Sequence, residues 1–183
     1  TPAKVAKLDP EDPALIVFTS GTTAEPKGVI YPQRYLTGQA LQARHWFGAE
    51  PGDLCWCTAA PGWSKSARNS FIAPWLRGAK SLLVEGRFDP ETRLEIVRQQ
   101  QVNVLCQAPT EYRILAKRTE LSAAPSLRRM VSAGEALNPE VIGAFREATG
   151  LEPADGYGQT ETGAVTGMRP EEAVAGREGS MGR

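Results

Sequence analysis

Short apolar runs alternate with helical patterns along most of the chain, and this alternation restricts the possible fold more than any other feature of the sequence. Runs rich in β-branched or aromatic residues are predicted to be strands at 15–19, 54–58, 80–84, 103–107 and 129–132. Segments with apolar residues at helical spacing follow them or lie between them, at 34–46, 66–77, 90–101, 109–118 and 139–149. Such alternation predicts an α/β fold with a mostly parallel β-sheet flanked by helices.

Local signals mark several borders of these helices. Asp89 before Pro90, and Asn138 before Pro139, each combine a typical N-cap residue with a proline in the first turn. Gly150 is a typical residue for the end of a helix. These signals support the helix borders inferred from the apolar pattern.

The composition excludes several classes of protein. The 183 residues are 41% hydrophobic, and 21 basic residues balance 21 acidic ones, so no global charge favours nucleic acid or an anionic membrane. No apolar run reaches the roughly 20 residues of a membrane span. Three cysteines without zinc-site spacing are predicted to be reduced core residues. We therefore expect a cytoplasmic protein, and leave its oligomeric state open.

The segment from Thr19 to Gly28 follows the first apolar run and is rich in hydrogen-bond donors. It holds four hydroxyl side chains, a lysine and two glycines in ten residues. A polyphosphate requires such donors and such charge, because its oxygens only accept hydrogen bonds. The spacing differs from the Walker pattern, since Pro26 stands where the second glycine would lie. From the residues alone, a polar strand-to-helix turn with a solvated Lys27 remains an alternative.

Two further motifs lie towards the end of the chain. In the segment 155–163, glycines flank Tyr157, whose ring is suited to stacking on a flat base, and Glu161 offers a hard oxygen ligand for Mg²⁺. Thr160 can donate to a phosphate. The turn 132–137 follows a predicted strand and precedes a predicted helix. Taken alone, both segments are equally compatible with polar surface turns.

Together the three motifs resemble those of the adenylate-forming, or AMP-binding, enzymes, which include acyl-CoA synthetases, luciferases and peptide-synthetase adenylation domains. The stretches 52–63 and 73–79 are most similar to acetyl- and medium-chain acyl-CoA synthetases. The resemblance covers nearly the whole chain. It implies that residues 1–183 form the central ATP/AMP-binding portion of the large N-terminal domain, and we expect the preceding N-terminal part and the C-terminal lid domain to be absent.

The resemblance implies a ligase reaction in two halves. A carboxylic acid, such as a fatty acid, reacts with ATP to give acyl-AMP and pyrophosphate, and the thiol of CoA, the co-substrate, then takes the acyl group. Mg²⁺ would accompany ATP. Two alternatives remain open: adenylation of an acid for a carrier-protein thiol, and a non-catalytic nucleotide-binding module. A fragment of this length is expected to be poorly active or inactive by itself.

The resemblance also assigns residues. Catalytic roles fall to Lys27, Thr160 and Glu161, with Glu161 as the metal ligand. Ala24 stands where the family most often has glycine, which implies a stiffer phosphate loop. The residues implied to contact the nucleotide are Thr19, Ser20, Gly21, Thr22, Thr23, Ala24, Glu25, Pro26, Lys27, Gly28, Gly134, Glu135, Ala136, Asp155, Gly156, Tyr157, Gly158, Gln159 and Thr160.

Trp63 is the candidate for the acyl pocket. In the relatives, the loop that carries this tryptophan and the helix after it help to enclose the acyl group, so Trp63 would limit chain length by filling volume. A tryptophan that only packs in the core is the alternative. Lys65 and Arg68 follow in the same segment, and they indicate either solvent-facing side chains or a polar or acidic substrate.

Overall fold

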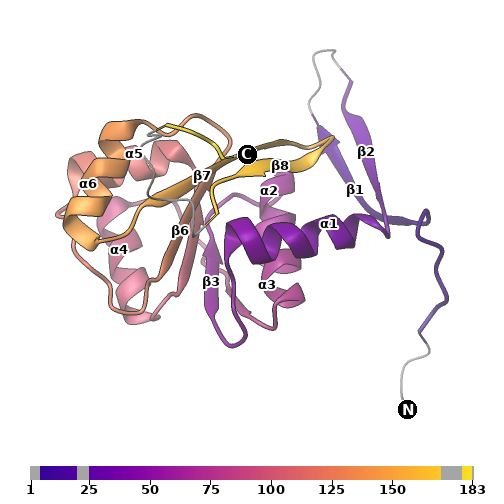
Figure 1. Ribbon diagram of the computed structural model, residues 1–183, viewed down its shortest axis with the longest axis horizontal. Helices are drawn as coiled ribbons and strands as arrows, with labels where there is room; N and C mark the ends of the chain where they lie inside the picture. Colours follow the sequence, from indigo (N-terminus) through magenta and orange to yellow (C-terminus); the bar gives the residue numbers. More distant parts are fainter. Residues whose placement is uncertain (1–4, 20–24, 170–178, 183) are drawn as a thin grey trace.

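The computed structural model describes residues 5–19, 25–169 and 179–182 and shows a layered α/β fold (Figure 1). Its six-stranded sheet has the order β4-β3-β5-β6-β7-β8. All neighbouring pairs are parallel except β7 and β8, which are antiparallel. The predicted fold class is therefore confirmed. The strands are β3 (Leu54–Cys57), β4 (Lys80–Leu82), β5 (Val104–Gln107), β6 (Arg129–Ala133), β7 (Pro153–Gln159) and β8 (Gly163–Gly167).

Helices cover both faces of the sheet, in line with the predicted helical segments. One face packs against α1 (Tyr35–Gln42), the π-helical segments η1 (Ala43–Phe47) and η2 (Ala67–Ile72), and the short helices α2 (Ser64–Ser66) and α3 (Ala73–Leu76). The other face packs against α4 (Pro90–Gln99), α5 (Pro109–Arg118) and α6 (Pro139–Thr149). In the part of the chain that is described, no helix has the length and apolar character needed to span a membrane.

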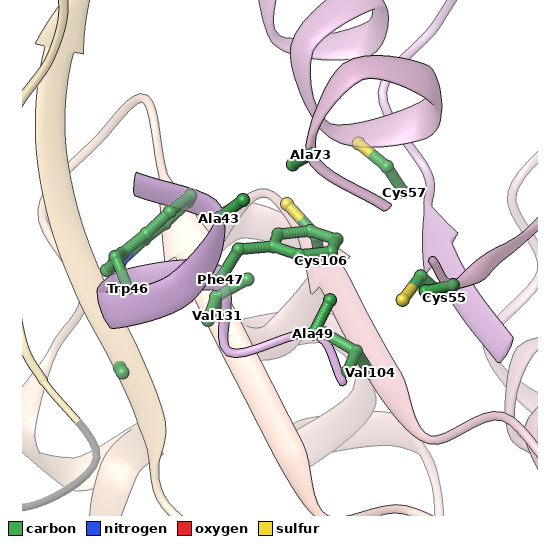
Figure 2. Packing of buried hydrophobic residues seen from close by; sticks show 12 residues of the cluster. Ala43, Trp46, Phe47, Ala49, Cys55, Cys57, Ala73, Val104, Cys106 and Val131 are labelled. Carbon is green, nitrogen blue, oxygen red and sulfur yellow. The ribbon is translucent and has the colours of Figure 1, made fainter. Parts of the chain in front are cut away.

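Two apolar cores result, because successive side chains of a strand point to opposite faces of the sheet. Trp56 and Leu105 belong to the core under α4, α5 and α6, whereas their neighbours Cys57 and Cys106 belong to the opposite core. In that opposite core the ring of Phe47 reaches from η1 towards β5 beside Cys106 (Figure 2).

The cysteines confirm the prediction of reduced core residues. Cys55, Cys57 and Cys106 are free and buried. Burial raises the pKa of the Cys55 thiol to about 12 and raises that of Cys106 as well. Thiols with raised pKa values are unreactive at neutral pH, so Cys55 and Cys106 contribute to packing. Cys57 differs, because its contact with Cys106 lowers the pKa of its thiol to about 7.

The helix borders follow the local signals, with one difference. The Asp89 side chain accepts a hydrogen bond of 2.8 Å from the Thr92 backbone N–H, and Pro90 opens α4. Asn138 occupies the N-cap of α6, but its side chain makes no capping hydrogen bond. Gly150 ends α6 in the left-handed region, with φ of 74°. Pro139 therefore sets the start of α6 by its fixed φ alone.

The first predicted strand does not join the sheet. β1 (Pro13–Thr19) pairs with β2 (Lys27–Pro32) in a separate antiparallel hairpin, which projects from the layered body (Figure 1). The prediction of a strand at this place is right, but the expectation that it would belong to the parallel sheet is wrong. The physical reason is the short link to β2, because only antiparallel strands can be joined by a tight loop.

Candidate functional site

The turn after β6 and the strand β7 lie side by side, so two of the three predicted motifs meet at one edge of the sheet. Ser132 is paired with Asp155, and Ala133 with Gly156. The turn 134–136 continues from β6 at the same edge. The carboxyl ends of parallel strands meet there, which is where an open α/β sheet binds its ligands.

Asp155 ties these two motifs together. Its side chain is 2% exposed, and its carboxylate accepts hydrogen bonds from the backbone N–H groups of Leu137 (3.1 Å) and Gly156 (3.0 Å). Burial raises the pKa of this carboxyl, and the two backbone donors act in the opposite direction. The side chain of Asp155 thus holds the turn 134–136 against β7.

The side chain of Glu135 is hydrogen-bonded to two residues of α5. Its carboxylate accepts hydrogen bonds from the Thr110 hydroxyl (2.7 Å) and from the Arg113 guanidinium (2.6 Å), and these two contacts lower its pKa. Gly134 has a φ of 113°, a left-handed conformation that favours glycine. The turn 134–136 therefore has a defined shape, and Glu135 and Ala136 are exposed.

The glycines of the Tyr157 motif are required by internal packing. A Cβ atom at Gly156 would lie 2.7 Å from Nε1 of Trp46, and one at Gly158 would lie 2.1 Å from the carbonyl oxygen of Gly163. Tyr157 lies between the two glycines, and strand alternation points its side chain to the other face, where it is 46% exposed. The glycines admit Trp46 and β8, while the exposed ring of Tyr157 is accessible to a ligand.

Thr160 stands in the turn between β7 and β8 and is held from two other elements. The Tyr31 hydroxyl of β2 donates a hydrogen bond to the Thr160 carbonyl oxygen. The hydroxyls of Ser64 and Thr160 lie 3.2 Å apart. The Arg68 guanidinium donates to the Ser64 hydroxyl (3.1 Å) and to the Gln159 carbonyl oxygen (3.4 Å). Sequence reasoning had not singled out Tyr31 or Ser64, because no motif marks a residue whose contact lies about a hundred positions away.

Lys65 clamps the ends of two strands. Its Nζ donates to the carbonyl oxygens of Gln107 at the end of β5 (2.9 Å) and Ala133 at the end of β6 (2.8 Å). Arg68 is also turned inward and is only 9% exposed. The first alternative, that these two cations face solvent, is therefore wrong for both. The other alternative, a polar or acidic substrate, stays a prediction.

The phosphate-loop segment is only partly described. Ser20, Gly21, Thr22, Thr23 and Ala24 lie outside the described residues. The flanking residues are placed: Thr19 ends β1, and Lys27 begins β2 directly opposite it. The side chains of Lys27, Thr19 and Tyr31 share one face of the hairpin, because Thr19 is opposite Lys27 and Tyr31 follows four residues later on the same strand. Glu25, Pro26, Lys27 and Gly28 are all exposed.

Two of the predicted site residues stand on exposed turns. Trp63 is 71% exposed at the start of α2, so it does not pack in the core. Glu161 is exposed in the turn between β7 and β8. Within residues 5–19, 25–169 and 179–182, no group of three or more histidine, cysteine, aspartate or glutamate side chains is placed to hold a metal ion.

All 183 residues match the family described as AMP-binding enzyme, so the chain belongs to this family. This confirms the resemblance drawn from the three motifs. The chain is 39% identical over 186 residues to an uncharacterized acyl-CoA ligase of Bacillus subtilis, and the match covers 98% of this chain and 34% of that protein. It is 38% identical over 179 residues to a mitochondrial acyl-coenzyme A synthetase of Rattus norvegicus, covering 94% of this chain and 30% of that protein.

Solved structures agree with these relatives. A Brucella canis acyl-CoA synthetase is 35% identical with a TM-score of 0.83, and the match covers 94% of this chain and 32% of that one. An anthranilate CoA ligase solved in complex with anthranoyl-AMP is 26% identical with a TM-score of 0.83, covering 100% of this chain and 36% of that one. The chain thus spans about a third of the length of the proteins it matches.

Proposed function

We propose that this chain is the nucleotide-binding part of an AMP-forming acid–thiol ligase, which makes an acyl-adenylate from a carboxylic acid and ATP and passes the acyl group to CoA. The observation that carries the proposal is the position of Thr160. Tyr31 of the hairpin and Ser64 of α2 both contact it, so the three regions implied to hold phosphates, adenine and acid meet at one residue. The relatives named as acyl-CoA ligases and synthetases support the same activity.

The nucleotide would lie across the carboxyl edge of the sheet. In this arrangement, the half-exposed ring of Tyr157 stacks on adenine, and the turn 134–136 borders the base. Thr160 donates to the α-phosphate. Lys27 contacts the leaving pyrophosphate, and its place on the same hairpin face as Tyr31 supports this role, because Tyr31 is the residue that reaches Thr160. The binding roles of Thr19 and residues 20–28 belong to the same proposal.

Glu161 fits a magnesium ion shared with ATP. Mg²⁺ is commonly bound by one or two carboxylates together with substrate phosphates, so it does not require a complete protein cage. The single exposed carboxylate at the turn next to Thr160 suits that mode, whereas a site built from protein ligands alone does not fit the described residues. The ion would neutralise phosphate charge, and Glu161 would hold the ion beside Thr160.

The compartment and the domain boundaries are part of the proposal. Three free, buried cysteines support a reducing compartment such as the cytoplasm. The two sheet-covering layers support treating residues 1–183 as one nucleotide-binding portion of a larger domain. CoA as the thiol acceptor is supported by the names of the relatives, and a carrier-protein thiol is the second candidate.

The test is acid-dependent release of pyrophosphate by the full-length protein that contains this chain. It is supplied with ATP, Mg²⁺ and acids from acetate to decanoate, aromatic acids included, with and without CoA. We expect release that depends on the acid, and a thioester only when CoA is present. ATP binding without release for any acid would refute the ligase and favour a nucleotide-binding module. Thioester formation on a carrier protein but not on CoA would identify the carrier-protein thiol as the acceptor.

Two pairs of variants test the assigned residues. Tyr157→Ala should raise KM for ATP about ten-fold or more, since stacking contributes about 1–3 kcal/mol per base, whereas Tyr157→Phe keeps the ring and should leave KM nearly unchanged. Glu161→Gln should raise the Mg²⁺ concentration needed for half-maximal rate, while Glu147→Gln, a change at another exposed glutamate, on α6, should not. An unchanged magnesium requirement in Glu161→Gln would remove that residue from the metal site.

A further inference from the structure

Arg68 is a buried cation without a carboxylate partner among the residues that the structure describes. It is 9% exposed, and it donates hydrogen bonds to the Ser64 hydroxyl and to the backbone carbonyl of Gln159. Arg93 is comparably buried but forms an ion pair of 3.0 Å with Glu111. Burial of an ion is costly unless a counter-charge compensates it. Unlike Arg93, Arg68 therefore leaves its charge available to an anionic ligand.

The groups around Arg68 do not supply that charge. Tyr31 and Tyr35 lie beside it, but burial raises the pKa of both hydroxyls, and the nearby guanidinium only moderates the shift. Both tyrosines are therefore neutral at physiological pH. Glu161 acts on Tyr31 as well, yet within residues 5–19, 25–169 and 179–182 it forms no ion pair with Arg68.

A second observation points to a ligand at the same place. The buried hydroxyl oxygen of Tyr35 has no hydrogen-bond partner among the described residues. The Tyr35 ring packs against the Tyr31 ring, and a Cβ atom at Gly163 would lie 3.3 Å from Tyr35 and 3.6 Å from Arg68. The Tyr35 hydroxyl and the Arg68 guanidinium therefore lie next to each other, and neither meets a carboxylate among the described residues. A carboxylate could accept hydrogen bonds from both.

The location relates this cation to the proposed reaction. Arg68 donates to Ser64 over 3.1 Å, and Ser64 lies 3.2 Å from the Thr160 hydroxyl, which is the proposed contact of the α-phosphate. The carboxylate that attacks the α-phosphorus must approach it to about 3–3.5 Å. An anion that pairs with Arg68 is thus close to the position from which attack occurs.

We propose that Arg68, assisted by the Tyr35 hydroxyl, binds the carboxylate of the acid substrate and positions it for attack on the α-phosphorus. This inference rests on the proposed function. One carboxylate oxygen forms the new bond to phosphorus while the bond from phosphorus to the bridging oxygen breaks, and the electron pair leaves with pyrophosphate. Arg68 holds the other carboxylate oxygen. The guanidinium neither gives up a proton nor changes its charge.

The steady-state constants distinguish this role. Arg68 contacts a charge that the acid already carries before the reaction, so its loss mainly weakens binding of the acid. ATP–pyrophosphate exchange by the full-length protein gives KM for the acid and for ATP separately. We expect Arg68→Met to raise KM for the acid by about ten- to a hundred-fold, the range expected for charged hydrogen bonds, and KM for ATP by less than about three-fold. Tyr35→Phe should give a smaller rise in the same constant.

Two further variants separate substrate binding from structure. Arg68→Lys keeps the charge but loses the planar fork, so its KM for the acid should lie between those of the wild type and Arg68→Met. Arg77→Met is the matched control, since Arg77 ends the same helical segment and donates to the Ala49 carbonyl oxygen (3.1 Å) far from Thr160. Its KM values should equal those of the wild type. If Arg68→Met does not fold, Arg68→Lys and Tyr35→Phe carry the test.

Several results would overturn the inference. One is an unchanged KM for the acid in Arg68→Lys and Tyr35→Phe; another is an equal rise in both KM values. A defect confined to dicarboxylic acids would also overturn it, because Arg68 would then hold a second carboxylate and not the reacting one. A wild-type protein without any acid-dependent exchange would refute the proposed function itself. An active wild type with unaffected variants would refute the role of Arg68 alone.

Discussion

Gly156→Ala tests whether the glycine of the Tyr157 motif exists for packing. The added Cβ atom would lie 2.7 Å from Nε1 and 2.9 Å from Cε2 of Trp46, and 3.1 Å from the Thr166 carbonyl oxygen. Trp46 is 6% exposed in the core under η1 and cannot swing into solvent without vacating that core. Overpacking of this kind costs about 1–3 kcal/mol. We expect Gly156→Ala to lose that amount of unfolding free energy.

The measurement is urea unfolding followed by circular dichroism. Gly143→Ala is the matched control, because a Cβ atom there meets nothing within 4 Å. It lies inside α6, where alanine should be more stable than glycine by about 0.5–1 kcal/mol.

In a Trp46→Phe background the cost of Gly156→Ala should shrink by more than about 1 kcal/mol. The buried indole N–H of Trp46 has no partner among the described residues, so its removal breaks no hydrogen bond that the structure shows. Equal stability of Gly156→Ala and the wild type, or an undiminished cost in the Trp46→Phe background, would refute the reasoning.

Three further perturbations test the polar contacts near the sheet edge. Lys65→Met removes both strand-end hydrogen bonds and should lower the free energy of unfolding by about 2 kcal/mol, measured by the urea midpoint; an unchanged midpoint would contradict the clamp. Glu111→Ala leaves the buried Arg93 uncompensated and should cost about 3–5 kcal/mol in the same assay, against less than about 0.5 for the exposed Glu147→Ala. Burial raises the pKa of Asp155 above 3.8, so its contribution to stability is fully present below pH 3.8 and is lost as pH rises through the folded pKa. Asp155→Asn, which does not titrate, should therefore gain stability relative to the wild type as pH rises from about 4 to 7, and a pH-independent difference would exclude this cause.

The parallel part of the fold could be predicted because its signals are local. The strands β3, β5 and β6 are short apolar runs, and α4 and α6 begin at Asp89-Pro90 and Asn138-Pro139. A buried strand flanked by helical periodicity has few alternatives. Strand β7 was not predicted, because a glycine-rich sequence has low strand propensity. Its glycines make room for Trp46, and this contact between distant segments has no local signature.

Only the motifs of the candidate site could be predicted from the sequence, and not the directions of the other side chains around them. The turn 134–136 and the segment from Tyr157 to Glu161 were identified by resemblance, and their proximity follows from the pairing of β6 with β7. The directions of Lys65 and Arg68 could not be predicted. Lys65 turns inward because two strand ends leave carbonyl oxygens at the same point, and Arg68 does so because the turn between β7 and β8 comes back to α2.

A hydrogen bond links the hairpin to the sheet edge and connects two motifs that lie far apart in the sequence. Tyr31 donates to Thr160, and strand alternation places Lys27 and Thr19 on the same hairpin face as Tyr31. Four residues of a strand span about 13 Å, and this is a length that a polyphosphate chain and a lysine side chain can bridge together. A ligand with its α-phosphate at Thr160 would therefore extend its remaining phosphates along this face towards Lys27. The opposite face of the hairpin carries the exposed apolar side chains of Ile16, Phe18 and Ile30, whereas Val17 and Val29, which share the face of Lys27, are partly buried. The face that carries Lys27 and Tyr31 is therefore the one that we propose for the polyphosphate.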